Sequence, residues 1–319
     1  MERDNKIMTT QKHTATYLAI YDTLNNKGQV IKNIIKIEKE MNVELLNWKD
    51  EEIIAFLKKF ESISPVSLKK KLATLREFAS YICKEENIET PVYTLDESVF
   101  MSSIKTDKLL SVTLSYEQFQ NIRGQLGMAS IGETVNYRDK LIFELAWYGL
   151  TEDEMRMLKK DDVEFIDRKG TEIALLTLCT GKLVPIDDAE VIEDIKQCAI
   201  TDEITRIAKD GRFKTTGYKD SEYLIRPGKS GASSPNAYFG KPTTALKCAF
   251  VKDNITCDGI NMYDISLANI RRSGLILLLA KKNEKIFDFK TVAAIYNLKT
   301  PFGLCWYREV ADLKYTMDK

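Results

Sequence analysis

The chain has 319 residues, of which 44% are hydrophobic and 29% charged, a composition typical of globular proteins and long enough for two cores. Its 47 basic and 47 acidic residues cancel, so a basic surface must come from charges segregated onto one face. No stretch approaches the roughly 20 apolar residues that cross a membrane, and the polar N-terminus lacks the apolar core of a signal peptide. We therefore expect a cytoplasmic protein without a membrane partner.

Two residue counts exclude classes of chemistry. The six cysteines are scattered without paired spacing, which predicts reduced thiols and neither disulfides nor a zinc site. The chain has a single histidine, His13, close to the N-terminus. A mechanism that needs a histidine in the rest of the chain is excluded by this count alone. We expect neither a metal nor a cofactor.

The first part of the chain, 1–88, has the apolar spacing of several short helices. They are expected at about 14–24, 30–41, 51–60 and 66–84, with Asp50 as the cap of the third. The fourth helix combines an apolar face with basic residues at other positions, namely Lys69, Lys70, Lys71 and Arg76. Such residues form either a solvated charged face or a surface laid on DNA phosphates.

Residues 89–112 are expected to form an exposed linker. Pro91 cannot continue a helix, and the stretch lacks sustained periodicity.

The second part, 113–319, opens with Ser115 and Gln118 at the spacing of a capping box. A long apolar helix then ends at Gly149, and Thr151 is placed to cap the helix that follows. Short runs in which β-forming residues alternate along the chain, separated by turns, predict a small three-stranded antiparallel sheet. Its strands are expected at about 163–166, 172–179 and 182–186.

Residues 204–247 are rich in glycine and in basic residues, which include Arg212, Lys214 and Arg226. Tyrosines lie between these basic residues. The segment is either a plain flexible surface loop or a surface that follows DNA phosphates.

An apolar helical run near the C-terminus contains two adjacent arginines, Arg271 and Arg272. Its buried face is expected to consist of Ile270, Leu275, Ile276, Leu278 and Leu279. Burying guanidinium groups at the start of a helix is costly unless they meet anions. The pair is therefore either a structural ion pair at a helix end or a phosphate clamp.

The frame from Ala268 to Ser273 resembles the helix of tyrosine recombinases (phage integrases) that carries a His-x-x-Arg motif, with Arg271 at the arginine position. Gly149 and Leu150 resemble the family's Gly-Leu-Arg junction, and Tyr307 has the spacing of its nucleophilic tyrosine. The resemblance implies a mainly α clamp of two domains. Residues 1–88 would be a helical core-binding domain, 89–112 a linker, and 113–319 a catalytic-like domain with a small sheet.

Several positions depart from the family pattern. Thr151 stands where the family has its first catalytic arginine, and Ala268 and Leu298 stand at its two histidines. Lys182 is the nearest match to the family's hairpin lysine, although it could equally be a solvated turn residue. Loss of one donor to a transferring phosphoryl group costs roughly 3–4 kcal/mol. Loss of acid–base help costs about another hundred- to ten-thousand-fold in rate.

Another arginine, Arg272 or Arg138, could fill the gap left at position 151, but the missing histidines have no such replacement. The resemblance therefore implies a recombinase fold without strand cleavage. It is reused as a sequence-specific transcriptional repressor, similar to the recombinase-like repressors that keep SPβ-type prophages in lysogeny.

Its expected partners are double-stranded operator DNA and a regulatory protein. The tail, 308–319, is expected either to mediate self-association or to be a frayed end. The alternatives are an active integrase that uses Tyr307 and an accessory recombination protein.

Overall fold

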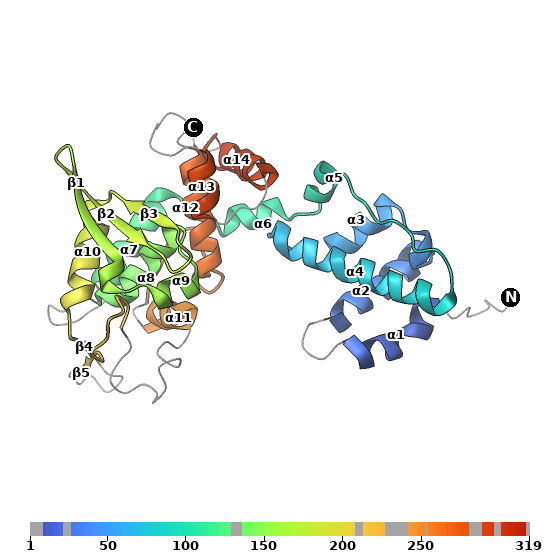
Figure 1. Ribbon diagram of the computed structural model, residues 1–319, viewed down its shortest axis with the longest axis horizontal. Coiled ribbons are helices and arrows are strands. Elements are labelled where there is room, and N and C mark those ends of the chain that lie inside the picture. The colour runs from blue at the N-terminus through green and yellow to red at the C-terminus, as the bar shows by residue number, and fades with distance from the viewer. Residues whose placement is uncertain are drawn as a thin grey trace. The chain divides into compact units, whose positions relative to one another are not determined.

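The computed structural model describes residues 9–21, 27–128, 136–207, 213–226, 242–252, 254–280, 289–296 and 301–316. The chain forms two compact units, Met1–Leu109 and Leu110–Lys319 (Figure 1). The division between them falls inside the range expected to be a linker. Within the described ranges, no helix has both the length and the apolar character needed to span a membrane.

The first unit is helical, as its apolar spacing predicts. Its described helices are α1 (Thr9–Tyr21), α2 (Lys27–Met41), α3 (Asp50–Lys58), α4 (Pro65–Glu86) and α5 (Glu97–Met101), with a 3-10 turn at Leu45–Asn47; α6 (Thr106–Ser111) spans the division between the units. Ser64 caps α4 by accepting a hydrogen bond from the Ser67 amide, and Asn87 ends the helix in the left-handed conformation. The prediction that Asp50 caps α3 is wrong. Asp50 is the first helical residue, and Lys49 takes the cap position.

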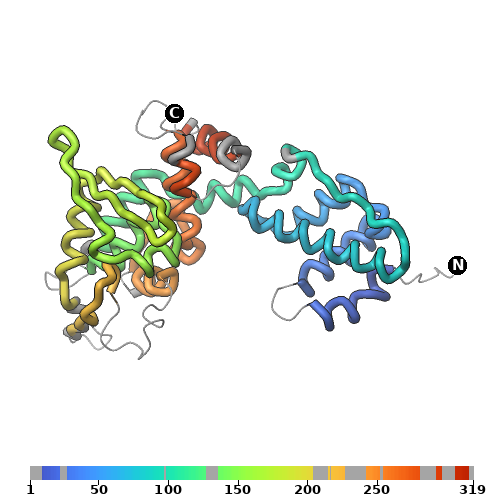
Figure 2. Tube along the Cα trace, in the orientation of Figure 1, coloured from blue at the N-terminus to red at the C-terminus, as the bar shows by residue number. Residues whose placement is uncertain are grey.

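The segment 89–112 is not simply an exposed strap. Figure 2 traces it along the first unit after α4, through an extended stretch and into α5. Tyr93 is buried, its hydroxyl donates to the Leu45 carbonyl oxygen at 2.6 Å, and its own carbonyl oxygen accepts a hydrogen bond from Arg76 Nε at 2.8 Å. Phe100 and Ile104 are buried as well. The sequence pattern does not reveal these buried anchors, because isolated residues have no periodicity.

The second unit combines helices with the three-stranded sheet predicted from the sequence. Its further described elements are α7 (Tyr116–Met128), α8 (Tyr137–Trp147), α9 (Glu152–Met157), a 3-10 turn (Lys160–Asp162), β1 (Val163–Arg168), β2 (Thr171–Thr177), β3 (Leu183–Ile186), α10 (Ala189–Ile200), β4 (Glu203–Ile207), β5 (Phe213–Gly217), α11 (Pro242–Lys252), α12 (Leu267–Ala280), α13 (Phe289–Ile295) and α14 (Pro301–Thr316). The sheet is antiparallel with β2 in the centre, and Ala174 pairs with Phe165 on one side and with Ile186 on the other.

The core of this unit lies around α8, whose described neighbours include α7, α10 and α12 (Figure 1). Residues 141–147 of α8 are all buried, which explains why the sequence there is apolar on every side except at Glu144. On α12, four of the five residues expected in the buried face are buried, and Leu278 is half-buried. Helix α14 packs against α12, and this contact sets the position of Tyr307.

The segment 204–247 is not only loop. It contains the hairpin β4–β5, in which Arg206 pairs with Lys214, and the first part of α11. Residues 208–212 and 227–241 lie outside the described part of the chain. The hairpin was missed because its polar strands lack an apolar face of period two.

Gly274 allows α12 to pack closely on the end of α8. A Cβ added at this glycine would lie 2.0 Å from the Trp147 carbonyl oxygen, and backbone cannot yield as a side chain can. Gly274→Ala is therefore expected to lower the free energy of unfolding by about 1–3 kcal/mol, which urea denaturation can measure. Gly124→Ala is the matched control, since a Cβ there meets nothing within 4 Å and alanine favours the helix. Equal stability of the two variants would contradict this packing.

Candidate functional site

Arg271 is the centre of the candidate site. It projects from the second turn of α12, and its Nε donates to the Gly149 carbonyl oxygen at 2.6 Å. Its Nη2 is buried and has no hydrogen-bond partner among the described residues. Burial lowers the pKa of Arg271, and the charge of Glu154 chiefly opposes this change. A guanidinium held in this way keeps its charge, and its Nη2 is a buried donor that no described residue satisfies.

A second cluster lies beside Arg271 and is built on Glu154, the third residue of α9. One carboxylate oxygen accepts from the Thr151 amide at 2.7 Å and from the Thr151 hydroxyl at 2.8 Å. The other lies 3.1 Å from Lys182 Nζ, and both side chains of this ion pair are nearly inaccessible, at 3% and 7% exposure. Thr151 thus caps α9, as predicted, in a complete capping box.

The pKa values in this cluster reflect burial and pairing together. Burial would raise the pKa of Glu154, but the hydrogen bonds from Thr151 and the Lys182 ammonium outweigh it, and the net shift is downward. Burial lowers the pKa of Lys182, Glu154 opposes this, and Arg271 adds to the lowering. Lys182 is therefore not a solvated turn residue; it lies within electrostatic reach of Arg271.

Tyr307 is buried on α14, at 6% exposure. Burial raises the pKa of its hydroxyl, while Arg272, by charge and by a side-chain hydrogen bond, and Arg271, by charge, oppose the rise. The structure therefore brings Tyr307 next to both arginines of α12. Tyr296 lies on another side of Arg271, with its ring centre 5.8 Å from the guanidinium carbon.

The fold matches solved structures, although no family model and no curated protein sequence matches the chain. The XerH site-specific recombinase, bound to a palindromic difH substrate in a post-cleavage complex, is similar with a TM-score of 0.52 and 14% identity over 97% of this chain and 81% of that one. This chain has a tyrosine-recombinase-like fold. A Tn1549 transposon integrase in complex with circular intermediate DNA gives a TM-score of 0.49 at 13% identity, covering 94% of this chain and 95% of that one.

Within this tyrosine-recombinase-like fold, the three positions at which the sequence departs from the recombinase pattern have different surroundings. Thr151 lies at the site, but its hydroxyl donates a hydrogen bond to Glu154. Ala268 is exposed at the start of α12. Leu298 lies outside the described residues.

Arg138 and Arg272 are the candidate substitutes for the missing arginine. Arg138 pairs with Asp139 at 2.8 Å and lies over the Tyr218 ring, so its contacts belong to another part of the unit. Arg272 donates to the Asn269 side chain at 2.8 Å and also contacts Tyr307. Of the two, Arg272 is the one at the site.

The basic residues of α4 have different surroundings. Lys69 and Lys70 are exposed, and Lys71 is half-buried. Lys69 lies 5.9 Å from the Phe100 ring centre, and Lys71 lies 5.4 Å from that of Phe60. Arg76 is exposed in part, but its Nε is used to hold the Tyr93 carbonyl. Part of the Arg76 guanidinium is therefore used within the first unit.

Arg226 does not belong to a basic surface. It is buried at 3% exposure, pairs with Asp202 at 2.8 Å and donates to the Thr201 carbonyl oxygen. Its role is to tie the segment before α11 to the end of α10. Arg212 and the side chain of Lys214 lie outside the described part of the chain.

Sequence reasoning singled out Thr151, Lys182, Arg271 and Tyr307, but it did not include Glu154 and Tyr296 among the site residues. The spacing from Thr151 to Glu154 is that of a capping box and is the signal that could have found Glu154. Tyr296 has no such signal, because its contact with Arg271 depends on how α13 follows α12 in space.

Proposed function

We propose that this chain is a sequence-specific DNA-binding transcriptional repressor that maintains prophage lysogeny on a recombinase-like fold no longer able to cleave DNA. Its solved neighbour, XerH, is a site-specific recombinase bound to its DNA substrate, and this likeness supports DNA as the partner. In this proposal Arg271 and Arg272 bind a backbone phosphate, and the lysines of α4 bind others. Phosphate contacts of this kind position a protein on DNA.

The surroundings of Glu154 carry the proposal of lost cleavage. Phosphoryl transfer needs positive groups around the phosphorus and groups that exchange protons. Here the position of the family's first arginine carries a neutral threonine hydroxyl, and the charge of Lys182 is spent on Glu154 at 3.1 Å. The only histidine of the chain, His13, belongs to the other unit, where it contacts Glu86 at 2.6 Å. A site arranged in this way can bind a phosphate but lacks most of what transfers one.

One observation favours an active recombinase instead. Tyr307 lies beside two guanidinium groups, which oppose the rise of its pKa and would stabilise a tyrosinate nucleophile. This alternative predicts strand breaks at the bound sites. The accessory-protein alternative, self-association through the tail and a regulatory protein partner stay predictions.

Recovery of DNA fragments bound in the host genome tests the proposal. The repressor role predicts a few specific sites upstream of phage genes, with intact strands at each site. Recovery of no specific fragment would contradict it, and strand breaks at the recovered sites would favour the recombinase.

Arg271→Ala is expected to weaken binding to such a fragment on the order of tenfold, because a charge-assisted hydrogen bond to the backbone is lost. Gel shifts at fixed salt measure this change. Arg168→Ala, at the β1–β2 turn where the side chain is exposed, is the matched control and should bind as the wild type does. Equal affinity of Arg271→Ala and wild type would remove Arg271 from the DNA interface.

A further inference from the structure

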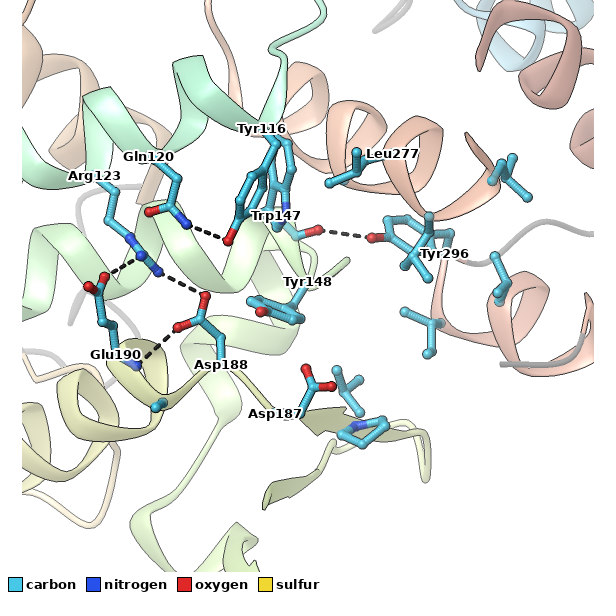
Figure 3. Close-up of a pocket in the computed structure, with 18 of the residues that line it drawn as sticks. Tyr116, Gln120, Arg123, Trp147, Tyr148, Asp187, Asp188, Glu190, Leu277 and Tyr296 are labelled. Atoms are coloured by element: carbon cyan, nitrogen blue, oxygen red, sulfur yellow. Dashed lines mark hydrogen bonds and ion pairs between the residues drawn. The ribbon is translucent and has the colours of Figure 1, made fainter. Parts of the chain in front are cut away.

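The second unit contains a cavity of about 660 Å³. It is bounded by α7, the end of α8, the connection from β3 to α10, the last turns of α12, and α13 (Figure 3). This volume lies within the range of about 300–1,000 Å³ that holds small ligands in other proteins. Nothing in the proposed binding of DNA uses this cavity.

One wall of the cavity is apolar. Leu277 of α12 and Val292 and Ile295 of α13 line it, and the last two are buried at 5% and 4% exposure. Such a wall accommodates an aliphatic or aromatic body of a ligand by removing it from water.

The opposite side is acidic. Asp187, Asp188 and Glu190 line it at the start of α10, and Figure 3 shows their side chains near those of Arg123 and Tyr148. Arg123 faces the same space, but its Nη1 lies 3.0 Å from Asp188, its Nη2 pairs with Glu190, and its Nε lies 3.9 Å from Glu144. Its charge is therefore neutralised within the protein.

Asp187 remains available to a ligand. It is exposed, and no hydrogen bond to its side chain is found among the described residues. Burial, followed by the charges of Asp188 and Asp187, raises the pKa of Tyr148, as expected where the potential is negative. The other cation of the lining, Arg308, is exposed on α14. A cationic group next to Asp187 thus meets a carboxylate that no internal partner has satisfied.

We propose that this cavity binds a small amphipathic cation, with its apolar body against Leu277, Val292 and Ile295 and its amine or guanidinium against Asp187. The cavity and Arg271 share one contact residue, Tyr296. Tyr296 lines the cavity, donates to the Trp147 carbonyl oxygen at 2.9 Å, and lies under the Arg271 guanidinium. Binding itself does not depend on whether the chain binds DNA.

The test uses the full chain without DNA and three probes that share one apolar body: 4-phenylbutylamine as the cation, 4-phenylbutan-1-ol as the neutral analogue and 4-phenylbutyrate as the anion. Titration calorimetry gives each dissociation constant. The tryptophan fluorescence of wild type, compared with that of Trp147→Phe to separate Trp147 in the lining from Trp48 and Trp306, reports the place of binding. The amine is expected to bind about fivefold tighter than the alcohol, and the anion is expected to bind most weakly.

Variants locate the two halves of the site. Asp187→Asn is expected to abolish the preference for the amine over the alcohol, whereas Asp220→Asn, an exposed aspartate outside the lining, keeps it. Ala189→Trp, at an exposed lining position in the first turn of α10, is expected to fill the space and abolish binding of all three probes.

Three outcomes overturn the proposal. One is equal or absent binding of the three probes. Another is preference for the anion, which would assign the cavity to Arg308. The third is a stable dimer of wild type that Ala189→Trp dissociates, because a second copy of the chain would then be the occupant.

Discussion

Glu154→Gln is expected to lower the free energy of unfolding of the second unit by about 3–5 kcal/mol. The substitution removes one partner of a buried ion pair and leaves the Lys182 ammonium at 7% exposure without a counter-charge. It also weakens the cap that the carboxylate provides to the Thr151 amide at the start of α9. Urea denaturation followed by circular dichroism measures the loss.

The double variant Glu154→Gln with Lys182→Met is the control, because it removes both charges and is expected to recover most of the lost stability. The pH dependence gives a second check. The pKa of Glu154 is lowered from 4.5 in the folded chain, so the ionised carboxylate contributes stability above this value. The difference between wild type and Glu154→Gln should therefore shrink as the pH falls below 4.5 through the folded-state pKa. A loss below about 1 kcal/mol at neutral pH would show that the pair is solvated.

Replacing Lys69, Lys70 and Lys71 together with alanine is expected to weaken DNA binding by about a hundredfold at moderate salt. Each lysine that neutralises a phosphate adds about 0.9 to the dependence of log affinity on log salt, so the slope should fall by up to about 3. Gel shifts or fluorescence anisotropy across a salt series measure the affinity and the slope together.

The matched control replaces Lys32, Lys36 and Lys39, three exposed lysines of α2, with alanine. This variant removes the same charge from the same unit. It should retain the affinity and most of the salt dependence of the wild type. If the α4 variant keeps the wild-type slope, α4 is not laid on DNA phosphates and its lysines form a solvated face.

Local patterns in the sequence were sufficient for much of the fold. Apolar spacing predicted the four main helices of the first unit, and alternation with turns predicted the three strands of the sheet. The capping box of Ser115 and Gln118 is formed, with hydrogen bonds of 2.8 and 3.1 Å. These features depend on residues that are neighbours in the chain, which is why a pattern can reveal them.

The contacts that define the site are not local. Lys182 and Glu154 are 28 residues apart, and Arg271 reaches the Gly149 carbonyl across 122 residues. Arg226 was predicted to lie on a DNA-binding surface because its segment is basic. Its side chain is instead buried, where it pairs with Asp202 and donates to the Thr201 carbonyl oxygen. Charge in a sequence says that a group needs a partner, but only the packing decides whether this partner lies inside or outside the chain.

In the proposed function, the groups that hold a phosphate persist around Arg271, and the groups that transfer it are gone. A suicide substrate tests it most directly: a nicked duplex of the bound sequence, which traps a covalent protein–DNA adduct if the tyrosine attacks. We predict specific binding without an adduct for wild type, and the same affinity for Tyr307→Phe. A covalent adduct that forms with wild type and is lost in Tyr307→Phe would contradict the account.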